Sequence, residues 1–86
     1  MASDVLPRYL TIRSKKLEKI DRQDQSRIIS AIRALSNTPR PQGCQKLSGR
    51  PAWRIRVGPY RIIYEIHDEK LLILVVTIGH RKEVYR

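Results

Sequence analysis

Residues 53–64 read Trp-Arg-Ile-Arg-Val-Gly-Pro-Tyr-Arg-Ile-Ile-Tyr, and this stretch decides the fold. Before the glycine, apolar and cationic residues alternate, which is typical of a strand with one buried face. The pair Gly58-Pro59 fits a two-residue hairpin turn of type II′, whose first central position favours glycine. A hairpin closed by this turn places Arg56 directly opposite Arg61 on the neighbouring strand.

The predicted hairpin sorts its side chains by chemistry, because successive residues of a strand point to opposite faces of the sheet. One face is apolar and is expected to pack beneath helices; it carries Trp53, Ile55, Val57, Tyr60, Ile62 and Tyr64. The other face carries Arg54, Arg56 and Arg61. Neighbouring guanidinium groups repel each other unless an anion lies among them, so this face is predicted to bind one.

The segments on either side of the hairpin complete a small α+β domain. Periodicity and turn residues predict an edge strand at 8–13, helices at 15–20 and from 21 to about 36, a loop at 37–51, and strands at 53–57, 60–66 and 71–78. The last strand is apolar on both faces, which indicates a position inside the sheet. We expect a single domain over residues 1–86, with two N-terminal helices packed on one face of a mainly antiparallel sheet of about four strands.

The composition narrows the class of protein. The chain has 86 residues and a net charge of +10, and twelve of its eighteen cations are arginines, which suits phosphate binding. This excess indicates a polyanionic partner: nucleic acid, an anionic membrane or an acidic protein. The longest apolar run, at 71–76, is too short to span a membrane, and the first ten residues lack the apolar stretch of a signal peptide. With one cysteine and two histidines, the sequence predicts a cytoplasmic domain without metal or cofactor.

The cations gather in two segments. Residues 25–64 contain eight Lys or Arg and no Asp or Glu, including Lys46 and Arg50 in the predicted loop. Solvated surfaces usually mix charges, so this run indicates a one-signed patch; the alternative is an ordinary basic surface. The segment 79–86 combines His80 and Tyr85 with three cations and a carboxylate, and its alternative interpretation is a polar tail tucked onto the sheet.

Three segments in register carry a family resemblance: Leu-Ser-Gly at 47–49, residues 53–66, and Gly-His-Arg-Lys-Glu-Val-Tyr at 79–85. Together they strongly resemble the RelE toxins of the RelE/ParE superfamily, which belong to type II toxin–antitoxin systems. The resemblance covers essentially the whole chain, in its length, in the helices before the sheet and in the order of the strands. It implies the RelE-like microbial ribonuclease fold and a ribosome-dependent endoribonuclease that cleaves translated messenger RNA in the ribosomal A site.

The same resemblance implies partners and site residues. The partners are a RelB-like antitoxin, messenger RNA and the ribosome through its 16S rRNA; no membrane is involved, and promoter DNA is contacted only through the antitoxin complex. Arg61 matches the arginine that stabilises the scissile phosphate, while Arg81 and Tyr85 match the C-terminal catalytic arginine and tyrosine. Arg54 and Arg56 match basic strand residues that bind RNA phosphate in the family. The cations Lys46, Arg50 and Lys82 of this sequence are expected to bind RNA phosphate as well.

Metal-free RNA cleavage uses the ribose 2′-hydroxyl as nucleophile and needs a base, charge stabilisation at phosphorus and help for the leaving oxygen. Many relatives have lysine where this chain has Arg54 and Arg56, and an arginine does not serve as a base. The remaining candidates for the base are Tyr85, His80 and Glu83. Nearby guanidinium groups favour a phenolate, so we expect Tyr85 to be the base, with Arg81 or His80 assisting the leaving group.

Two other classes of function stay open on the residues alone. The first is a non-nuclease toxin of the ParE type that acts on gyrase or another protein target, for which replacing Arg61 or Tyr85 leaves toxicity intact. The second is a basic RNA-binding module without catalysis, whose RNA binding weakens steeply with salt and gives no cleaved product.

Overall fold

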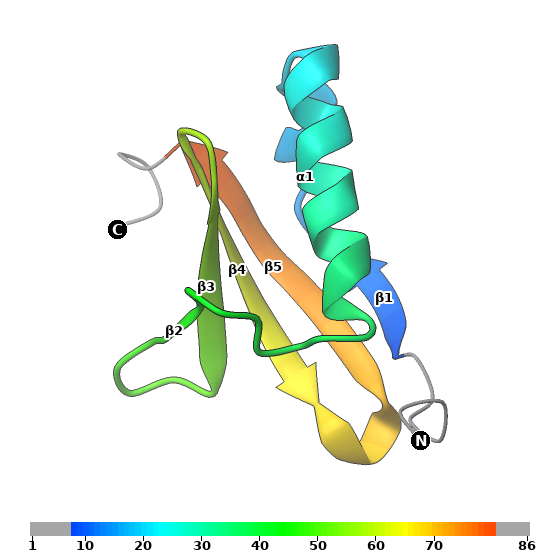
Figure 1. Ribbon diagram of the computed structural model, residues 1–86, viewed down its shortest axis with the longest axis vertical. Coiled ribbons are helices and arrows are strands. Elements are labelled where there is room, and N and C mark those ends of the chain that lie inside the picture. The colour runs from blue at the N-terminus through cyan, green and yellow to red at the C-terminus, as the bar shows by residue number, and fades with distance from the viewer. Residues whose placement is uncertain (1–7, 81–86) are drawn as a thin grey trace.

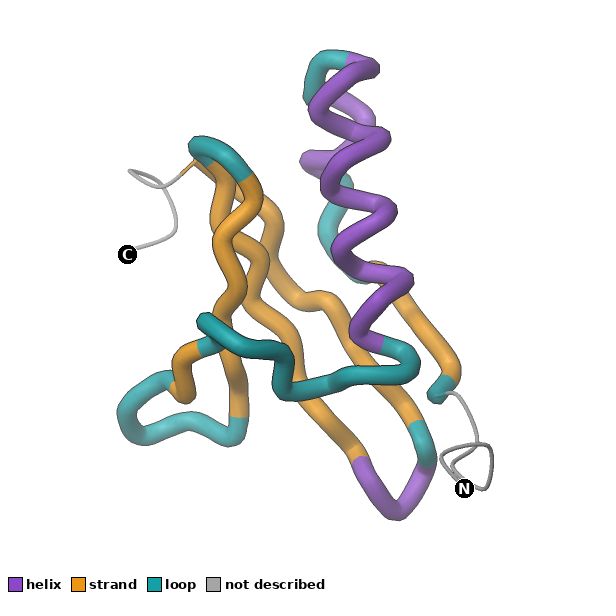
Figure 2. Tube along the Cα trace, viewed as in Figure 1, coloured by secondary structure: helices purple, strands orange, loops and turns teal. Residues whose placement is uncertain are grey.

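One long helix lies across one face of a five-stranded sheet in the computed structural model, which describes residues 8–80 (Figure 1). The strand order is β1-β5-β4-β3-β2, with β1 parallel to β5 and the other neighbouring pairs antiparallel. Figure 2 shows the helix standing beside the twisted strands. In chain order, the elements are β1 (Tyr9–Ile12), η2 (Lys16–Lys19), α1 (Arg22–Leu35), β2 (Gln45–Lys46), β3 (Ala52–Val57), β4 (Tyr60–His67), η3 (Asp68–Lys70) and β5 (Leu72–His80).

The β3–β4 hairpin has the predicted register. Val57 pairs with Tyr60 across the turn, and the pairing continues along the whole of β3. Gly58 has a φ of 58°, in the left-handed region that a side chain would strain. Because Pro59 is restricted to a φ of about −65°, the two residues together match the type II′ turn.

The helix α1 ends where its sequence predicts. Its last residue is Leu35, and Ser36 is the C-cap, three residues before Pro39. Ile28, Ile32 and Leu35 recur at the spacing of one helical face, and each is at most 1% exposed. This stripe packs on the apolar face of the hairpin.

Two details of the predicted fold are wrong. The predicted helix at 15–20 is a 3₁₀-helix of four residues, Lys16–Lys19, because Ile20 is already extended (φ −92°, ψ 145°) and turns the chain toward α1. The sheet also has a fifth strand, β2, inside the predicted loop, where it pairs with Trp53 and Arg54. Both residues of β2 are polar and exposed, so no apolar alternation marks this strand in the sequence.

The strand β5 lies inside the sheet, between β1 and β4, as its apolar sequence indicates. Its pairing with β4 slips by one residue, which leaves Val76 without a partner on β4. This bulge reverses the alternation of faces along β5. As a result, Ile73, Val75 and Ile78 all join the core beneath α1, although Val75 and Ile78 are an odd number of residues apart.

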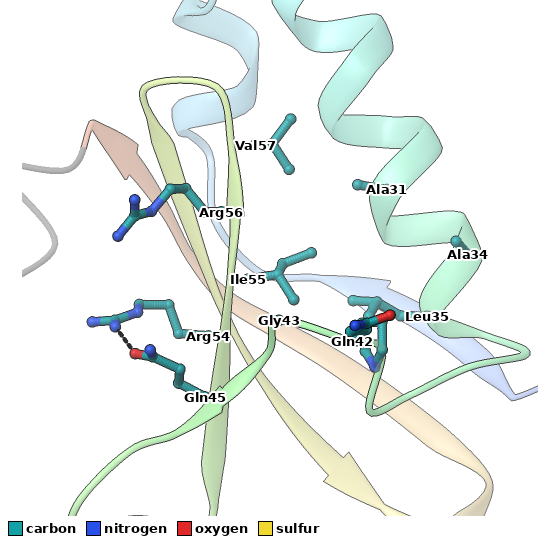
Figure 3. A pocket seen from close by; sticks show the side chains of 11 residues that line it. Ala31, Ala34, Leu35, Gln42, Gly43, Gln45, Arg54, Ile55, Arg56 and Val57 are labelled. Atoms are coloured by element: carbon teal, nitrogen blue, oxygen red, sulfur yellow. Dashed lines mark hydrogen bonds between the residues drawn. The ribbon is translucent and has the colours of Figure 1, made fainter.

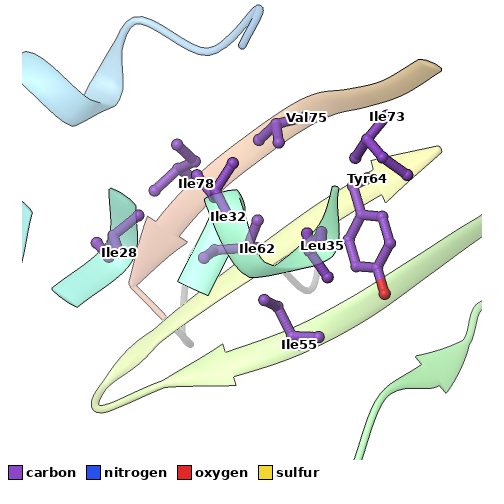
Figure 4. Close-up of a cluster of buried hydrophobic side chains, with 9 residues drawn as sticks. All are labelled: Ile28, Ile32, Leu35, Ile55, Ile62, Tyr64, Ile73, Val75 and Ile78. Atoms are coloured by element: carbon purple, nitrogen blue, oxygen red, sulfur yellow. The ribbon is translucent and has the colours of Figure 1, made fainter. Parts of the chain in front are cut away.

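The core fills the space between α1 and the covered face of the sheet (Figure 4). Tyr64 is its largest fully buried side chain, and the Tyr64 hydroxyl donates a hydrogen bond of 2.7 Å to the carbonyl oxygen of Pro39. This bond holds the loop after α1 against the sheet. The buried core residues are Ile28, Ile32, Leu35, Ile55, Ile62, Tyr64, Ile73, Val75 and Ile78.

Replacing Ile32 with alanine is expected to lower the free energy of unfolding by about 2–5 kcal/mol, because it leaves a cavity between α1 and the sheet. Urea unfolding followed by circular dichroism measures the change. The control is Ser30→Ala, at an exposed position of the same helix, which is expected to change stability by less than about 0.5 kcal/mol. Equal effects of the two substitutions would contradict the packing described here.

Replacing Tyr64 with phenylalanine is expected to reduce the decrease in the free energy of unfolding as the pH rises into the alkaline range. Burial, and then the nearby Cys44, raise the pKa of Tyr64 above its ordinary value of 10.0. The unfolded chain therefore loses this proton at lower pH than the folded protein, so the contribution of Tyr64 is complete below about pH 10 and declines above it. Urea unfolding at neutral and alkaline pH measures the stability of both proteins. An equal loss of stability with pH in the two proteins would refute the contribution of Tyr64.

Candidate functional site

Three arginines of the hairpin lie on the sheet face that α1 does not cover. In Figure 3, the side chains of Arg54 and Arg56 point away from α1, whereas Ile55 and Val57 point toward it. Arg61 is directly opposite Arg56 in the register and therefore shares its face. The hairpin thus brings the predicted cations together across two neighbouring strands.

The three arginines differ in exposure. Arg56 is exposed, Arg54 is half-buried and donates a hydrogen bond to Oε1 of Gln45 (Figure 3), and Arg61 is only 5% exposed. The burial of Arg61 differs from the open cationic face that the sequence predicts. Its neighbour on β5 is Gly79, which has no side chain and so leaves room for a long arginine side chain beside the strand.

The cross-strand pairing of a buried arginine, Arg61, with an exposed one, Arg56, is a candidate site for an anion. Arginine keeps its charge throughout the physiological pH range, and a charge acts more strongly in the protein interior than in water. Arg61 and Arg56 have the same charge on adjacent strands, so an anion between them relieves their repulsion. A phosphate group fits this arrangement, because it accepts several charge-assisted hydrogen bonds at once.

His80 lies on the opposite face of the sheet from these arginines. It pairs with Tyr60, and the two rings meet edge to face with their centroids 6.0 Å apart. Tyr60 precedes Arg61 on β4, so the two residues point to opposite faces. The pairing of β4 with β5 thus places the His80 ring on the side of α1, and its role in the chemistry stays a prediction.

Lys46 is also on the other face. It pairs with Trp53, and its ammonium lies 5.7 Å from the centre of the Trp53 ring, while its Nζ donates a hydrogen bond of 3.2 Å to the carbonyl oxygen of Arg50. Arg40 approaches the same ring at 4.8 Å. Lys46 thus covers a half-buried tryptophan, and the structure does not bring it to the face of Arg54. Arg50 is exposed in the loop between β2 and β3.

The remaining predicted site residues lie outside the described part of the chain. These are Arg81 and Tyr85, the expected catalytic pair, together with Lys82 and Glu83. Their roles stay predictions from the sequence.

A hollow of about 360 Å³ lies beside the hairpin turn, on the face covered by helices; its lining includes Lys16, Lys19, Tyr60 and His80. The hydroxyl of Tyr60 lies 3.4 Å from Oδ2 of Asp24. Burial first, and then the negative charge of Asp24, raise the pKa of Tyr60. Asp24 thus favours the protonated form of the Tyr60 phenol.

A larger groove, of about 570 Å³, separates α1 from β3 (Figure 3). Ala31 and Ala34 form part of its helical wall, and Ile55 and Val57 form part of its strand wall. The helical periodicity places both alanines near the apolar face, yet Ala34 is exposed. No sequence signal marks the groove, because its width depends on how far α1 stands from β3.

Two further observations concern the described residues. Between residues 8 and 80, no three side chains of His, Cys, Asp or Glu come together in a group that could hold a metal ion. Neither is any helix in that range long and apolar enough to cross a membrane.

Comparison with known families gives one clear match. The family described as the ParE toxin of the type II toxin–antitoxin system parDE matches residues 6–85. No curated protein matches the chain at a significant level.

Several solved structures share the fold. The isolated RelE toxin of E. coli is 27% identical, covers 91% of this chain and 90% of its own, and superimposes with a TM-score of 0.75. The RelB–RelE antitoxin–toxin complex from Methanococcus jannaschii is 25% identical, with coverage of 90% and 94% and a TM-score of 0.68. The toxin–antitoxin complex RelBE2 from Mycobacterium tuberculosis is 21% identical, with coverage of 88% and 100% and a TM-score of 0.77, and supports the fold alone.

Replacing Arg56 with glutamine is expected to weaken binding of poly(uridine) and to reduce the slope of log affinity against log salt by about 0.7, because one phosphate contact is lost. Fluorescence anisotropy at several salt concentrations measures the slope. The control is Arg33→Gln, which removes an exposed cation of α1 and is expected to leave the slope unchanged. A slope unaffected by Arg56→Gln would remove Arg56 from the phosphate site.

Proposed function

Because this chain belongs to the ParE toxin family of type II toxin–antitoxin systems, we propose that it inhibits translation as a metal-independent endoribonuclease that cleaves messenger RNA in the ribosomal A site. Its fold and its identity to the RelE toxin of E. coli make it a RelE-type toxin of the RelE/ParE superfamily, as its sequence predicts. The proposal concerns which target such a toxin attacks and by what chemistry.

The cross-strand pair of Arg56 and Arg61 carries this proposal. A toxin that cleaves RNA must stabilise the charge that builds up on a phosphate in the transition state. The buried guanidinium of Arg61 is suited to that task, because a charge away from water acts more strongly on a phosphate. Arg56 and Arg54, which are more exposed, are suited to hold the neighbouring phosphates of the RNA strand.

The proposed reaction is an attack of the ribose 2′-oxygen on the adjacent phosphorus. In this proposal Tyr85 takes the proton of the 2′-hydroxyl, because guanidinium groups gathered at the bound phosphate would favour the phenolate form of a tyrosine. The bond between phosphorus and the 5′-oxygen breaks, and the leaving oxygen takes a proton from water, which yields a cyclic phosphate and a free 5′-hydroxyl. Arg81 assists the leaving oxygen; the position of His80 on the opposite face favours Arg81 over His80 for this role.

The proposed partners follow from the relatives and from the charge. The solved complexes pair RelE with RelB, and we propose a RelB-like antitoxin for this chain. The net charge of +10 suits binding to messenger RNA and to the 16S rRNA of the ribosome. In this proposal the toxin acts in the cytoplasm and contacts promoter DNA only through the antitoxin complex.

A second candidate function is inhibition of a protein target such as gyrase. The description of the matching family favours this second function, since that family is named for the ParE toxins. The arginine face would then be part of a protein interface, and removal of one catalytic side chain would leave toxicity unchanged. A test that scores toxicity and RNA cleavage separately distinguishes the two functions.

Replacing Arg61 with alanine is expected to reduce cleavage of translated messenger RNA by about 10²–10³-fold, because the scissile phosphate loses its buried cation. Tyr85→Phe is expected to reduce it by about 10²-fold or more, because the base is lost. Induced expression followed by primer extension on translated messages measures the cuts, and growth records the toxicity of each variant.

The matched control is Arg33→Ala, which removes an exposed cation of α1 and is expected to leave the cuts in place. Circular dichroism of each purified variant establishes that it folds. Arg81→Ala and His80→Phe separate the two candidates for the leaving group, and cleavage is expected to fall much further in Arg81→Ala. If the toxin arrests growth without cutting messenger RNA, and Arg61→Ala and Tyr85→Phe do not alter this arrest, the toxin acts on a protein target instead.

A further inference from the structure

The sheet face that α1 does not cover carries a carboxylate beyond the arginines. Ile62, Tyr64 and Ile66 of β4 pack toward α1, so the alternating residues Arg61 and Glu65 point to the opposite face. Within residues 8–80, Glu65 is the only Asp or Glu that lies in a strand. A single negative charge therefore follows the cations along β4.

Glu65 is close enough to the arginines to contact the same RNA strand. Ile63 lies between Arg61 and Glu65 on this face and pairs with Arg54 of β3. At about 3.3 Å per residue along a strand, Glu65 is about 7 Å from the row of Arg54 and about 13 Å from the row of Arg61. An RNA strand whose phosphates lie on the arginines can therefore bring one of its bases to Glu65.

The Glu65 carboxylate keeps an oxygen that can accept a hydrogen bond from a ligand. Nε2 of His67 donates a hydrogen bond of 2.9 Å to Oε1 of Glu65, whose side chain is 28% exposed. Among the described residues, Oε2 has no hydrogen-bond partner. The cross-strand neighbours of Glu65 are Ala52 and Leu74, whose side chains have no donor. A donor that approaches this part of the face therefore meets the carboxylate.

A carboxylate beside a phosphate-binding surface selects which part of the RNA approaches it. The negative charge repels phosphate groups, whereas the carboxylate oxygens accept hydrogen bonds from the amino groups of bases. Cytosine presents an N4 amino group, which is a known partner of Glu and Asp, while uracil presents an oxygen at the same position of its ring. A cytosine at Glu65 gains a hydrogen bond there, and a uracil meets repulsion.

We propose that Glu65, hydrogen-bonded by His67, is a specificity residue that reads the edge of a base and favours cytosine over uracil in the RNA strand bound to the arginines. The proposal rests on the proposed function in one respect, namely that RNA occupies the arginine face. It does not depend on how the strand is cleaved, because neither the base nor the leaving group of the reaction enters it.

The test compares two single strands of equal length, one of cytidine and one of uridine, with the full chain at neutral pH. Both strands carry 2′-O-methyl ribose, which blocks the nucleophile, so binding is measured without cleavage. Every nucleotide of a strand has the same base, so the result does not depend on which nucleotide reaches Glu65. Fluorescence anisotropy measures both affinities, and we expect the protein to bind the cytidine strand roughly fivefold more tightly or more.

Glu65→Gln removes the charge and keeps the shape of the side chain. A glutamine amide both donates and accepts hydrogen bonds, so it can bond to either base, and the preference for cytidine is expected to fall roughly fivefold. The matched control is Glu69→Gln, which removes the same charge at an exposed position of η3 and is expected to keep the preference. Circular dichroism establishes that each variant folds.

Arg56→Gln separates a failure of this proposal from a failure of the proposed function. It is expected to weaken binding of both strands alike, because it removes a phosphate contact that is common to them. If Arg56→Gln weakens both strands but Glu65→Gln leaves the preference intact, or if the unaltered protein binds both strands equally, Glu65 does not read a base and the RNA site stands. If Arg56→Gln weakens neither strand, RNA does not bind to the arginine face, and both proposals are overturned.

Discussion

The left-handed backbone at Gly58 is the constraint on which the rest of the structure depends. With a φ of 58° it allows a two-residue turn and so fixes Val57 opposite Tyr60. A slip of one residue would carry Arg61 toward α1 and Ile62 to the uncovered face, because the faces of a strand alternate. The register of this hairpin therefore sets both the burial of the core residues and the grouping of the arginines.

The bulge at Val76 lets β5 pair with β4 in this register while apolar residues on both sides of the bulge face α1. Beyond the bulge, Ile78 faces α1, while Gly79 falls opposite Arg61 on the uncovered face. The missing side chain at Gly79 leaves space for the guanidinium stem of Arg61. One irregularity in the sheet thus serves both the core and the candidate site, which agrees with the tendency of bulges to occur beside functional sites.

The arginine face carries the proposed function of the toxin. A like-charged pair such as Arg56 and Arg61 is stabilised by any suitable anion, and both a phosphate and a carboxylate qualify. Specificity must then come from what surrounds the charges. The groove beside β3 supplies an apolar surface next to these charges.

The sequence by itself determined the hairpin register, the end of α1 after Leu35 and the common face of Arg54, Arg56 and Arg61, because each depends on residues close together in the chain. The tertiary structure alone decided four features: the pairing of β2 with β3, the burial of Arg61, the side of the sheet on which His80 lies and the groove beside Ala34. The β2 strand pairs with a neighbour close in the chain but carries no apolar alternation that would mark it. The other three features depend on which distant strands pair, in what register, and on the distance between the helix and the sheet. Such distances are set by the packing of the whole core, and no local pattern of residues encodes them.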